Sequence, residues 1–382
     1  MGTLTFRERV KKAINHQEPD RVPIAIGGSA QKFDERVILQ LLDYFGIPQD
    51  NLEYVFAGFR YTYFCEQLWQ KLHIDTRYVY VNPEKKFTVD VQKQGKEYIN
   101  EWGLDLDFER GTFSDSFTLR KTPLGEANSV QDIEKYRWPH PDPEQLTRGL
   151  REKEVSFFQD GYSVMAYRPV IVGIFSMSRF LRGTDKFLVD MMLNKQFARA
   201  LLDKITQVQK IYYDSLIRAV GEHIQVVEVE DDLGTQRAPM MSPKLYHELI
   251  KPYHTEIVQF IKEKQPGIKV MLHSDGSIAQ IMPGLIEAGF DIINPVQTSA
   301  QGMDVRDLKR KFGDKIVFQG AIDTQHVLRG RPEDVEKEIK RIIDILAPGG
   351  GYVLGPSHNF TGDIPVKNIV KMFEVAAKYG VY

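Results

Sequence analysis

The chain has very little cysteine: Cys65 is the only one among its 382 residues. A single thiol excludes an internal disulfide bond and every metal or redox motif that needs a pair of cysteines. Long apolar runs are also missing, because the uncharged stretch at residues 169–178 is bounded by Arg168 and Arg179 and is too short to cross a bilayer. We therefore expect a cytoplasmic protein that has no membrane partner.

Neither sign of charge is in excess. The 50 Lys and Arg residues and the 52 Asp and Glu residues give a net charge of −2 without a run of like charges, which argues against nucleic acid or anionic lipid as the main partner. A P-loop, a G-x-G-x-x-G fingerprint and a G-x-S-x-G elbow are all absent, so nucleotide-phosphate and serine-hydrolase chemistry have no support. The composition, with 42% hydrophobic and 27% charged residues, is that of a globular protein.

Apolar runs typical of buried parallel strands recur along the chain, and amphipathic helical patterns follow them. Eight such β–α repeats predict an α/β fold, a (β/α)8 TIM barrel in which residues 1–382 form a single domain. Residues 81–122 alternate polar and apolar side chains between Gly and Pro breaks, which predicts an inserted layer of antiparallel hairpins. The expected strands are 22–27, 77–81, 163–167, 224–230, 268–273, 291–295, 316–320 and 352–355, and the clearest helices are 196–220, 243–264, 278–288, 332–346 and 365–378.

In such a barrel, reactive side chains lie at the carboxyl ends of the strands and in the loops that follow. The sequence MLHSDGS places His273 at the end of a strand and Asp275 in the next loop. Ser277 and Gln280 have the spacing of a helix capping box, which gives Ser277 a structural role. His273 and Asp275 are then either a metal-ligand or proton-transfer pair, or a core histidine beside a loop aspartate that bonds nearby amides.

Two more strand ends carry groups of the same type. His358, in GPSHNFTGD, follows the last expected strand and should lie across the barrel mouth from His273, where imidazole suits both metal binding and acid–base chemistry. In VEVEDDLGTQ, alternation puts Glu228 and Glu230 on one face of a strand, and an inward-facing carboxylate must be paired, protonated or metal-bound. The structural alternative is an acidic loop paired with neighbours such as Arg237.

These positions define the candidate site. His273, Asp275 and Glu230 are the candidate catalytic residues, and together with His358 they are candidate ligands of a hard N/O metal site that could hold Zn²⁺. Asp323 has a structural alternative, because it could simply cap a turn. The candidate substrate-binding residues are Tyr167, Arg168, Asp232, Asn294, Gln297, Asp323 and His358.

Several blocks of the sequence, in order, resemble the uroporphyrinogen decarboxylase superfamily over nearly the whole chain. They are RERVKKAINHQEPDRVPI, DDLGTQRAPMMSPKLYHELIKPY, HSDGSI, AGFDIINPVQ, and APGGGYVLGPSHN followed by DIPVKNI. The resemblance implies one (β/α)8 barrel with a deep cleft. Genuine decarboxylases of this family carry arginines after the first strand that hold the carboxylates of the tetrapyrrole, whereas AIGGSAQKF, residues 25–33, has Lys32 as its only cation.

The opening block and the hairpin insertion are instead similar to the corrinoid-dependent methyltransferase branch, which implies methyl transfer between a small methylated compound and a corrinoid protein. Thiol-methylating members of that branch share a zinc site of His-x-Cys plus a distant Cys. His273 matches the His, Asp275 stands in place of the first Cys, and residues 357–358 stand in place of the second. The missing thiolates disfavour thiol methylation and favour a methoxylated or methylamine-type donor.

Three functions therefore follow as hypotheses. In the first, an enzyme transfers the methyl group of a small donor, such as an aryl methyl ether, to Co(I) of a separate corrinoid protein, and a metal on His273 or a protonated Asp275 or Glu230 stabilises the departing oxygen. An exposed apolar rim that includes Phe360 would then be expected. In the second, a decarboxylase acts on a uroporphyrinogen-like or other carboxylated ring, and Asp232 or Asp275 stabilises a cationic intermediate. In the third, the barrel binds a small molecule or a protein without catalysis.

Overall fold

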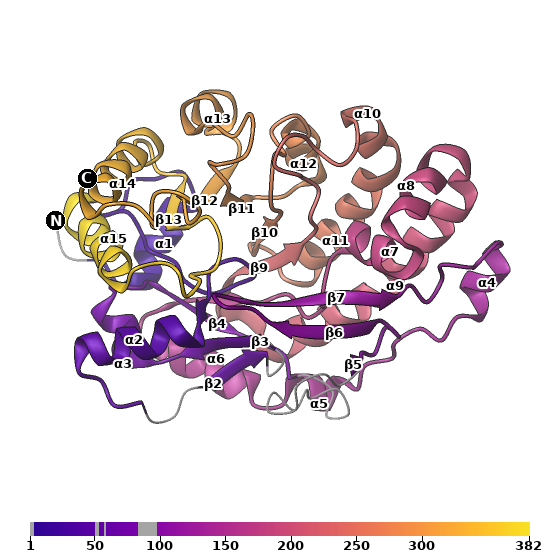
Figure 1. Cartoon of the computed structure of the whole chain (residues 1–382), viewed down its shortest axis with the longest axis horizontal. Coiled ribbons are helices and arrows are strands. Elements are labelled where there is room, and N and C mark those ends of the chain that lie inside the picture. Colours follow the sequence, from indigo (N-terminus) through magenta and orange to yellow (C-terminus); the bar gives the residue numbers. More distant parts are fainter. Residues whose placement is uncertain (1–3, 50–52, 57–58, 83–97) are drawn as a thin grey trace.

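A seven-stranded parallel sheet forms the centre of the protein in the computed structural model, which describes residues 4–49, 53–56, 59–82 and 98–382. Its strands are Thr76–Val79 (β4), Ser163–Ala166 (β8), Ile224–Glu230 (β9), Lys269–His273 (β10), Ile292–Val296 (β11), Val317–Ile322 (β12) and Tyr352–Pro356 (β13). Neighbours in the sheet follow the order β13–β12–β11–β10–β9–β8–β4, and the sheet curls so that helices surround it (Figure 1). These strands match seven of the eight expected runs to within two residues.

The first expected strand is not a continuous strand, and it forms one isolated parallel bridge between Ile24 and Leu354. The N–H of Ala25 donates to the carbonyl of Leu354 on one side, and the N–H of Asp75 donates to the carbonyl of Ile24 on the other. A regular ladder does not form because Pro23 has no N–H and the N–H of Ile24 donates to the side chain of Asp75 at 2.7 Å. The segment nevertheless joins the two edges of the curled sheet, β13 and β4.

The helices lie mainly outside the sheet, as the crossovers between parallel strands require (Figure 1). They are Phe6–Ala13 (α1), Glu35–Phe45 (α2), Glu66–Lys71 (α3), Val130–Lys135 (α4), Pro143–Thr147 (α5), Leu150–Gln159 (α6), Ile174–Arg182 (α7), Thr184–Leu193 (α8), Lys195–Val220 (α9), Pro243–Leu245 (α10), Lys251–Lys264 (α11), Met282–Ala288 (α12), Val305–Phe312 (α13), Pro332–Leu346 (α14) and Val366–Tyr379 (α15). None of the described helices combines the length and the apolar character needed to cross a membrane.

Two expected helices differ in detail from the sequence prediction. The helix expected at 243–264 is divided by a π-helical turn, Tyr246–Ile250, which ends just before Pro252, a residue with no N–H to continue the regular ladder. The helix expected from residue 278 begins only at Met282, and the predicted capping box does not form. Ser277 instead donates its hydroxyl to the carbonyl of Gln301 at 2.6 Å, so this side chain ties two loops together.

The interior of the curled sheet changes from apolar to polar toward the carboxyl ends of the strands. Its apolar layer takes one side chain from each strand and one from the bridging segment, and α1 covers it from below with Val10. Side chains two residues further along a strand face the same way. On four strands these positions hold the buried polar residues Glu228, His273, Asn294 and Gln319. The apolar layer consists of Ala25, Tyr78, Met165, Val226, Met271, Ile292, Val317 and Val353.

The inserted hairpin layer is present but small. An antiparallel sheet of Tyr98–Ile99 (β5), Asp105–Arg110 (β6) and Asp115–Lys121 (β7) lies within the expected span, and the KFTVDVQ stretch lies outside the described residues. A second small sheet, which the sequence did not predict, consists of Phe33–Asp34 (β1), Glu53–Phe56 (β2) and Phe59–Phe64 (β3). The N–H of Gly362 donates to the carbonyl of Phe113 at 2.8 Å, so the β6–β7 turn lies against the loop that follows β13.

Candidate functional site

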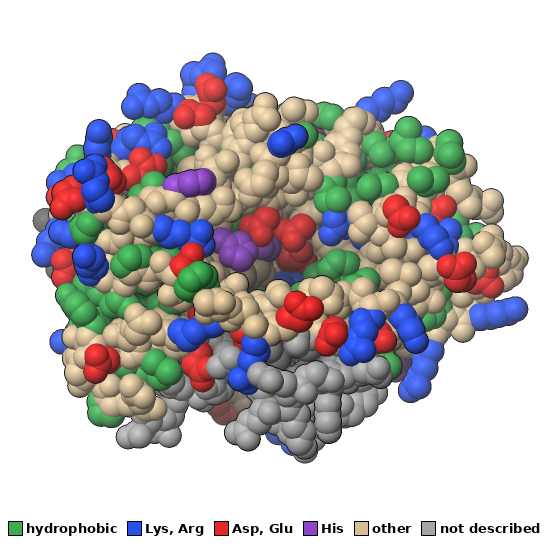
Figure 2. Space-filling view, viewed as in Figure 1, with side chains coloured by type: hydrophobic (Ala, Val, Ile, Leu, Met, Phe, Trp, Pro, Cys, Tyr) green, Lys and Arg blue, Asp and Glu red, His purple; other side chains and the backbone are tan. Residues whose placement is uncertain are grey.

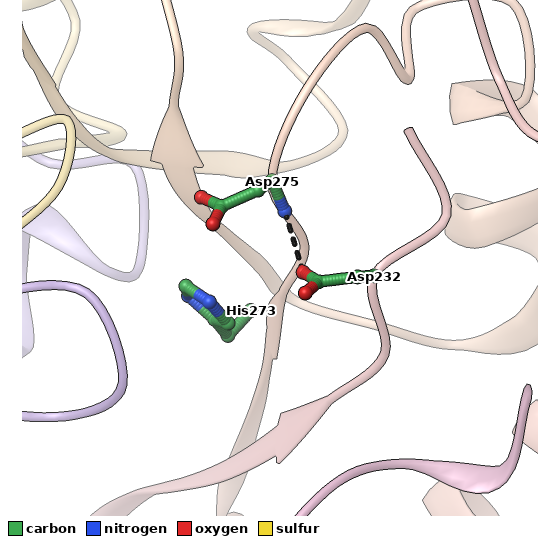
Figure 3. A group of neighbouring side chains, drawn as sticks. All are labelled: Asp232, His273 and Asp275. Carbon is green, nitrogen blue, oxygen red and sulfur yellow. Dashed lines mark hydrogen bonds between the residues drawn. The ribbon is translucent and has the colours of Figure 1, made fainter. Parts of the chain in front are cut away.

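Three side chains from the ends of β9 and β10 converge at the mouth of the curled sheet. Asp232, His273 and Asp275 each offer one ligand atom, and these atoms all lie within 4.8 Å of one another (Figure 3). The backbone N–H of Asp275 donates to Oδ1 of Asp232 at 3.0 Å. In the space-filling view, acidic and histidine side chains gather in a hollow near the middle of this face (Figure 2).

His273 is oriented by a neighbouring strand. It is the last residue of β10 and is 5% exposed, and its Nδ1 lies 3.0 Å from Oδ1 of Asn294 on β11. An amide oxygen can only accept, so this contact places a proton on Nδ1 and leaves Nε2 as the ligating nitrogen. Of the candidate substrate-binding residues, Asn294 is therefore the one that positions His273.

The two loops that carry the aspartates pack backbone against backbone. Gly276 has a φ of +86°, and a Cβ at this position would lie 2.7 Å from backbone atoms of Gly234 and Thr235. The N–H of Ser277 donates to the carbonyl of Thr235 at 2.7 Å, and the N–H of Gly276 donates to Oε1 of Gln297 at 2.7 Å. Gln297 thus supports the loop that presents Asp275.

The carboxyl group of Asp275, a half-buried residue, is incompletely hydrogen-bonded by the described residues. Burial raises its pKa to about 6, the nearby charge of His273 opposes this shift, and Asp232 adds to it. Its Oδ1 is buried and has no hydrogen-bond partner among the described residues, and its Oδ2 lies 3.5 Å from Nε2 of the half-exposed His358. A divalent cation would satisfy this carboxylate, and two carboxylates with one imidazole are suitable ligands for Zn²⁺.

Glu230 lies outside this group, although the sequence analysis included it among the metal ligands. Its Oε2 accepts the N–H of Gly173 at 2.6 Å and a hydrogen bond from Arg168 at 3.2 Å. Burial raises the pKa of Glu230 well above its ordinary value, and the charge of Arg168 opposes the shift. The acidic partner of His273 that comes from the end of β9 is Asp232, which the sequence analysis had placed among the substrate-binding residues.

Asp231, beside the site in sequence, has a structural environment. Its carboxylate accepts the backbone N–H groups of Phe175 and Ser176 at the start of α7, at 2.8 and 2.7 Å, and lies 3.0 Å from Nε2 of His254. His254 in turn contacts the hydroxyl of Tyr246 at 3.1 Å. This fully bonded carboxylate anchors α7 and α11 to the end of β9.

Arg168 is also held by protein groups. Its Nε donates to Oγ of Ser29 at 2.9 Å and to the hydroxyl of Tyr167 at 3.2 Å, and its guanidinium contacts Glu230. Ser29 also donates its hydroxyl to Glu228, which lies 3.9 Å from Arg168. Arg168 therefore neutralises two buried glutamates inside the curled sheet.

Two further expectations concern the loops after β12 and β13. Asp323 caps a turn, because its Oδ1 accepts the N–H of Gln325 at 2.7 Å and its Oδ2 contacts His326. Phe360 was expected on an exposed apolar rim, and this is wrong: it is fully buried and stacks on Phe33 with ring centroids 4.6 Å apart. Its backbone N–H donates to the carbonyl of the residue before Phe33, which draws the ring inward.

The sequence analysis did not include Lys32 among the candidate residues. The signal was present, because Lys32 is the only cation in AIGGSAQKF. Its side chain is 6% exposed, and the segment that carries it lies across the sheet opening from β10.

A family model described as "Uroporphyrinogen decarboxylase (URO-D)" matches residues 170–379, more than half of the chain. Among curated relatives, the uroporphyrinogen decarboxylase of Aliarcobacter butzleri (strain RM4018) is 28% identical over 180 residues, 47% of this chain and 48% of that protein. The uroporphyrinogen decarboxylase of Photorhabdus laumondii is 26% identical over 301 residues, 72% of this chain and 75% of that protein. The chain thus spans about half the length of the first of these relatives.

A solved structure described as a methyltransferase from Methanosarcina mazei is similar over nearly the whole chain. The TM-score is 0.65 at 17% sequence identity, and the match covers 98% of this chain and 99% of that one. At this identity, the similarity establishes the shared fold alone.

Proposed function

The chain belongs to the uroporphyrinogen decarboxylase family, and from this premise we propose that it is a methyltransferase that moves a methyl group from a small methylated substrate, such as an aryl methyl ether, to a corrinoid protein. We place residues 1–382 in a single (β/α)8 domain, with residues 22–27 in the place of the first strand. The observation that carries the proposal is the convergence of Asp232, His273 and Asp275 at the mouth, with one carboxylate oxygen unbonded among the described residues. The name of the solved structure with the same fold agrees with it.

Methyl transfer from an ether to Co(I) requires the protein to stabilise the leaving oxygen. Transfer to Co(I) breaks the carbon–oxygen bond of the donor: the methyl carbon goes to cobalt, which contributes both electrons of the new bond, and the electrons of the broken bond stay on oxygen. An oxygen anion is a poor leaving group, so its charge must be stabilised in the transition state. When bound to His273, Asp232 and Asp275, Zn²⁺ would act as a Lewis acid toward that oxygen.

The residues of the chain then have distinct tasks. Asn294 holds the imidazole of His273 in place through Nδ1, and the packed loops hold the two aspartates. In the alternative route without a metal, a protonated Asp275 would donate the proton to the departing oxygen, and His358, 3.5 Å away, would resupply it. A pKa of about 6 for Asp275 suits this transfer near neutral pH.

Methyl transfer to chemically reduced cob(I)alamin tests the proposal. We expect purified protein supplied with Zn²⁺ to consume Co(I) in the presence of 3-methoxybenzoate, with the phenol as co-product. His273→Ala should lower the rate at least ~100-fold, since it removes a ligand from the reacting centre. His140→Ala, a substitution at an exposed histidine in the connector before α5, serves as the matched control and should not change the rate.

Decarboxylation is the second candidate, and the names of the curated relatives favour it. A tetrapyrrole with many carboxylates needs several cationic donors, and the segment after the bridging residues offers Lys32 alone. We expect no release of carbon dioxide from uroporphyrinogen at an enzymatic rate of ~1 per second or more. Such release, together with no methyl transfer to cob(I)alamin by the wild-type protein, would replace the proposal with this alternative.

A further inference from the structure

A cavity of about 220 Å³ lies where the ends of α2 and α3 meet α15, and we call it the base cavity (Figure 1). The turn after α3 leads into β4, so the base cavity is at the amino ends of the strands, away from His273 and Asp275. Its apolar floor consists of three buried side chains, Leu72, Val370 and Phe373. An apolar cavity of roughly 150 Å³ is enough to bind benzene, so the base cavity can hold an apolar group of about six carbons.

Charged and polar side chains surround the opening of the base cavity. Its polar rim consists of four exposed residues, Lys71, His73, Glu374 and Lys378. Neither lysine forms an ion pair with any residue that the structure describes. Two ammonium groups and one carboxylate leave the polar rim with one net positive charge, which complements a monoanion.

His73 occupies a backbone position that usually belongs to glycine. Its φ is +56°, and its N–H donates to the carbonyl of Gln70 at 3.1 Å, while the N–H of Ile74 donates to the carbonyl of Trp69 at 3.1 Å. Such a helix end favours glycine, and another residue there costs conformational free energy. The histidine therefore serves the fold less well than glycine would, which points to a use for its imidazole in the base cavity.

The imidazole of His73 is mostly neutral near pH 7. Burial lowers its pKa below the ordinary value, and the charges of Arg21 and Lys378 act in the same direction. The charges of Asp75 and Glu374 oppose this shift. A neutral imidazole still donates one N–H, so His73 can bond an anion without adding a charge to the polar rim.

The carbonyl groups at the ends of α2 and α3 are already bonded. The N–H groups of Gly46 and Ile47 donate to carbonyls in the last turn of α2 at 3.1 and 2.8 Å, and His73 and Ile74 close α3 in the same way. The groups that the base cavity offers to an anion are therefore the ammonium groups and the imidazole N–H of the polar rim.

From these observations we propose that the base cavity binds a short aliphatic carboxylate, at the end of the sheet away from the mouth. The alkyl chain would lie on the apolar floor, and the carboxylate would accept hydrogen bonds from the two lysines and the imidazole of the polar rim. The volume limits the chain to about six carbons. The proposal does not depend on methyl transfer, because the base cavity shares no residue with the site at the mouth.

Calorimetric titration of the purified protein with three matched probes, hexanoate, hexan-1-ol and acetate, tests the proposal. A chelator is present, so that no carboxylate binds through a metal at the mouth. We expect hexanoate to bind at least ~5-fold more tightly than hexan-1-ol, which lacks the charge. It should bind at least ~10-fold more tightly than acetate, which lacks the longer chain.

Substitutions in the polar rim locate the binding. Lys71→Met combined with Lys378→Met should lower the affinity for hexanoate at least ~5-fold and change that for hexan-1-ol less than ~2-fold. Lys337→Met combined with Lys367→Met, at exposed positions on α14 and α15, removes the same charge and is the matched control. His73→Gly should weaken hexanoate binding at least ~3-fold without lowering the thermal midpoint of unfolding, because glycine suits this φ.

Equal affinities of the wild-type protein for hexanoate and hexan-1-ol would overturn the proposal, as would equal affinities for hexanoate and acetate. If the rim lysine substitutions leave hexanoate binding unchanged, the ligand binds elsewhere and the proposal is wrong. If that variant fails to fold, His73→Gly and the comparisons in the wild-type protein decide the question. Hexyl phosphate that binds at least ~10-fold more tightly than hexanoate would overturn the proposed ligand class in favour of a phosphate ester.

Discussion

The two ends of the curled sheet each carry an aspartate, and these aspartates differ in burial and in how completely protein groups bond them. At the base, Asp75 accepts Arg9 Nη1 at 2.7 Å, Arg21 Nη1 at 2.9 Å and the N–H of Ile24 at 2.7 Å. At the mouth, Asp275 has one buried oxygen without a hydrogen-bond partner among the described residues. A closed network stabilises the fold, whereas an incompletely bonded carboxylate is ready for a ligand or a proton.

The same contrast separates two neighbours in sequence. Asp231 is fully bonded to the start of α7 and to His254, whereas Asp232 accepts the N–H of Asp275 and faces His273. Two aspartates in the dipeptide Asp231–Asp232 therefore have opposite roles, because the backbone turns between them at the end of β9.

We expect the largest effect, a loss of stability, from a substitution of Asp75 at the base of the curled sheet. Asp75→Asn removes a buried carboxylate that pairs with Arg21 and with Arg9, which is 4% exposed and also pairs with Asp20, so we expect a loss of about 3–5 kcal/mol in the free energy of unfolding. Urea denaturation measures it, and Asp43→Asn, at an exposed aspartate in α2, is the control. A loss below ~1 kcal/mol would mean that the base is not a closed network of this strength.

An intermediate effect should come from the residue that orients the imidazole. Asn294→Ala removes the acceptor for Nδ1 of His273, so we expect Zn²⁺ affinity to fall about 10- to 100-fold. Competition with a chromogenic chelator measures this affinity. Asn128→Ala, on the exposed turn before α4, should leave it unchanged. If both variants bind Zn²⁺ equally, Asn294 does not position the ligand.

We expect the smallest effect from a substitution of Asp275, which should stabilise the fold, whereas Asp75→Asn should destabilise it. The pKa of Asp275, about 6, lies above the ordinary value of 3.8, so the folded protein binds this proton more tightly than the unfolded chain. The stabilisation from that proton is complete below about pH 4 and is lost as the pH rises through 6. With a chelator present, Asp275→Asn should therefore raise the free energy of unfolding at pH 7.5 by about 1–2 kcal/mol, after a discount for partial exposure.

At pH 4 the same substitution should have almost no effect on stability, because the wild-type carboxyl group is protonated there in the folded protein. Urea denaturation at the two pH values measures the difference. If Asp275→Asn instead lowers the free energy of unfolding at pH 7.5, the predicted difference between Asp75 and Asp275 is wrong. Asp275 would then belong to a closed network of hydrogen bonds, as Asp75 does.

The sequence by itself determined the features that depend on local periodicity. Apolar runs identified seven strands to within two residues, and alternation along β9 placed Glu228 and Glu230 on one face. The position of His273 at the end of its strand followed from the same pattern, as did Asp275 in the next loop. These properties are local because neighbouring residues in a strand alternate between its two faces.

Only the tertiary structure decided which carboxylate joins His273. A Cβ on Gly173 would lie 1.6 Å from the carbonyl oxygen of Glu230, so the start of α7 can pack on the end of β9 only because this residue is glycine. That contact brings a backbone N–H to Glu230 and leaves Asp232 to face the imidazole. The pairing depends on the contact between Gly173 and Glu230, which are 57 residues apart in the sequence. The residues around either position do not indicate that the two meet.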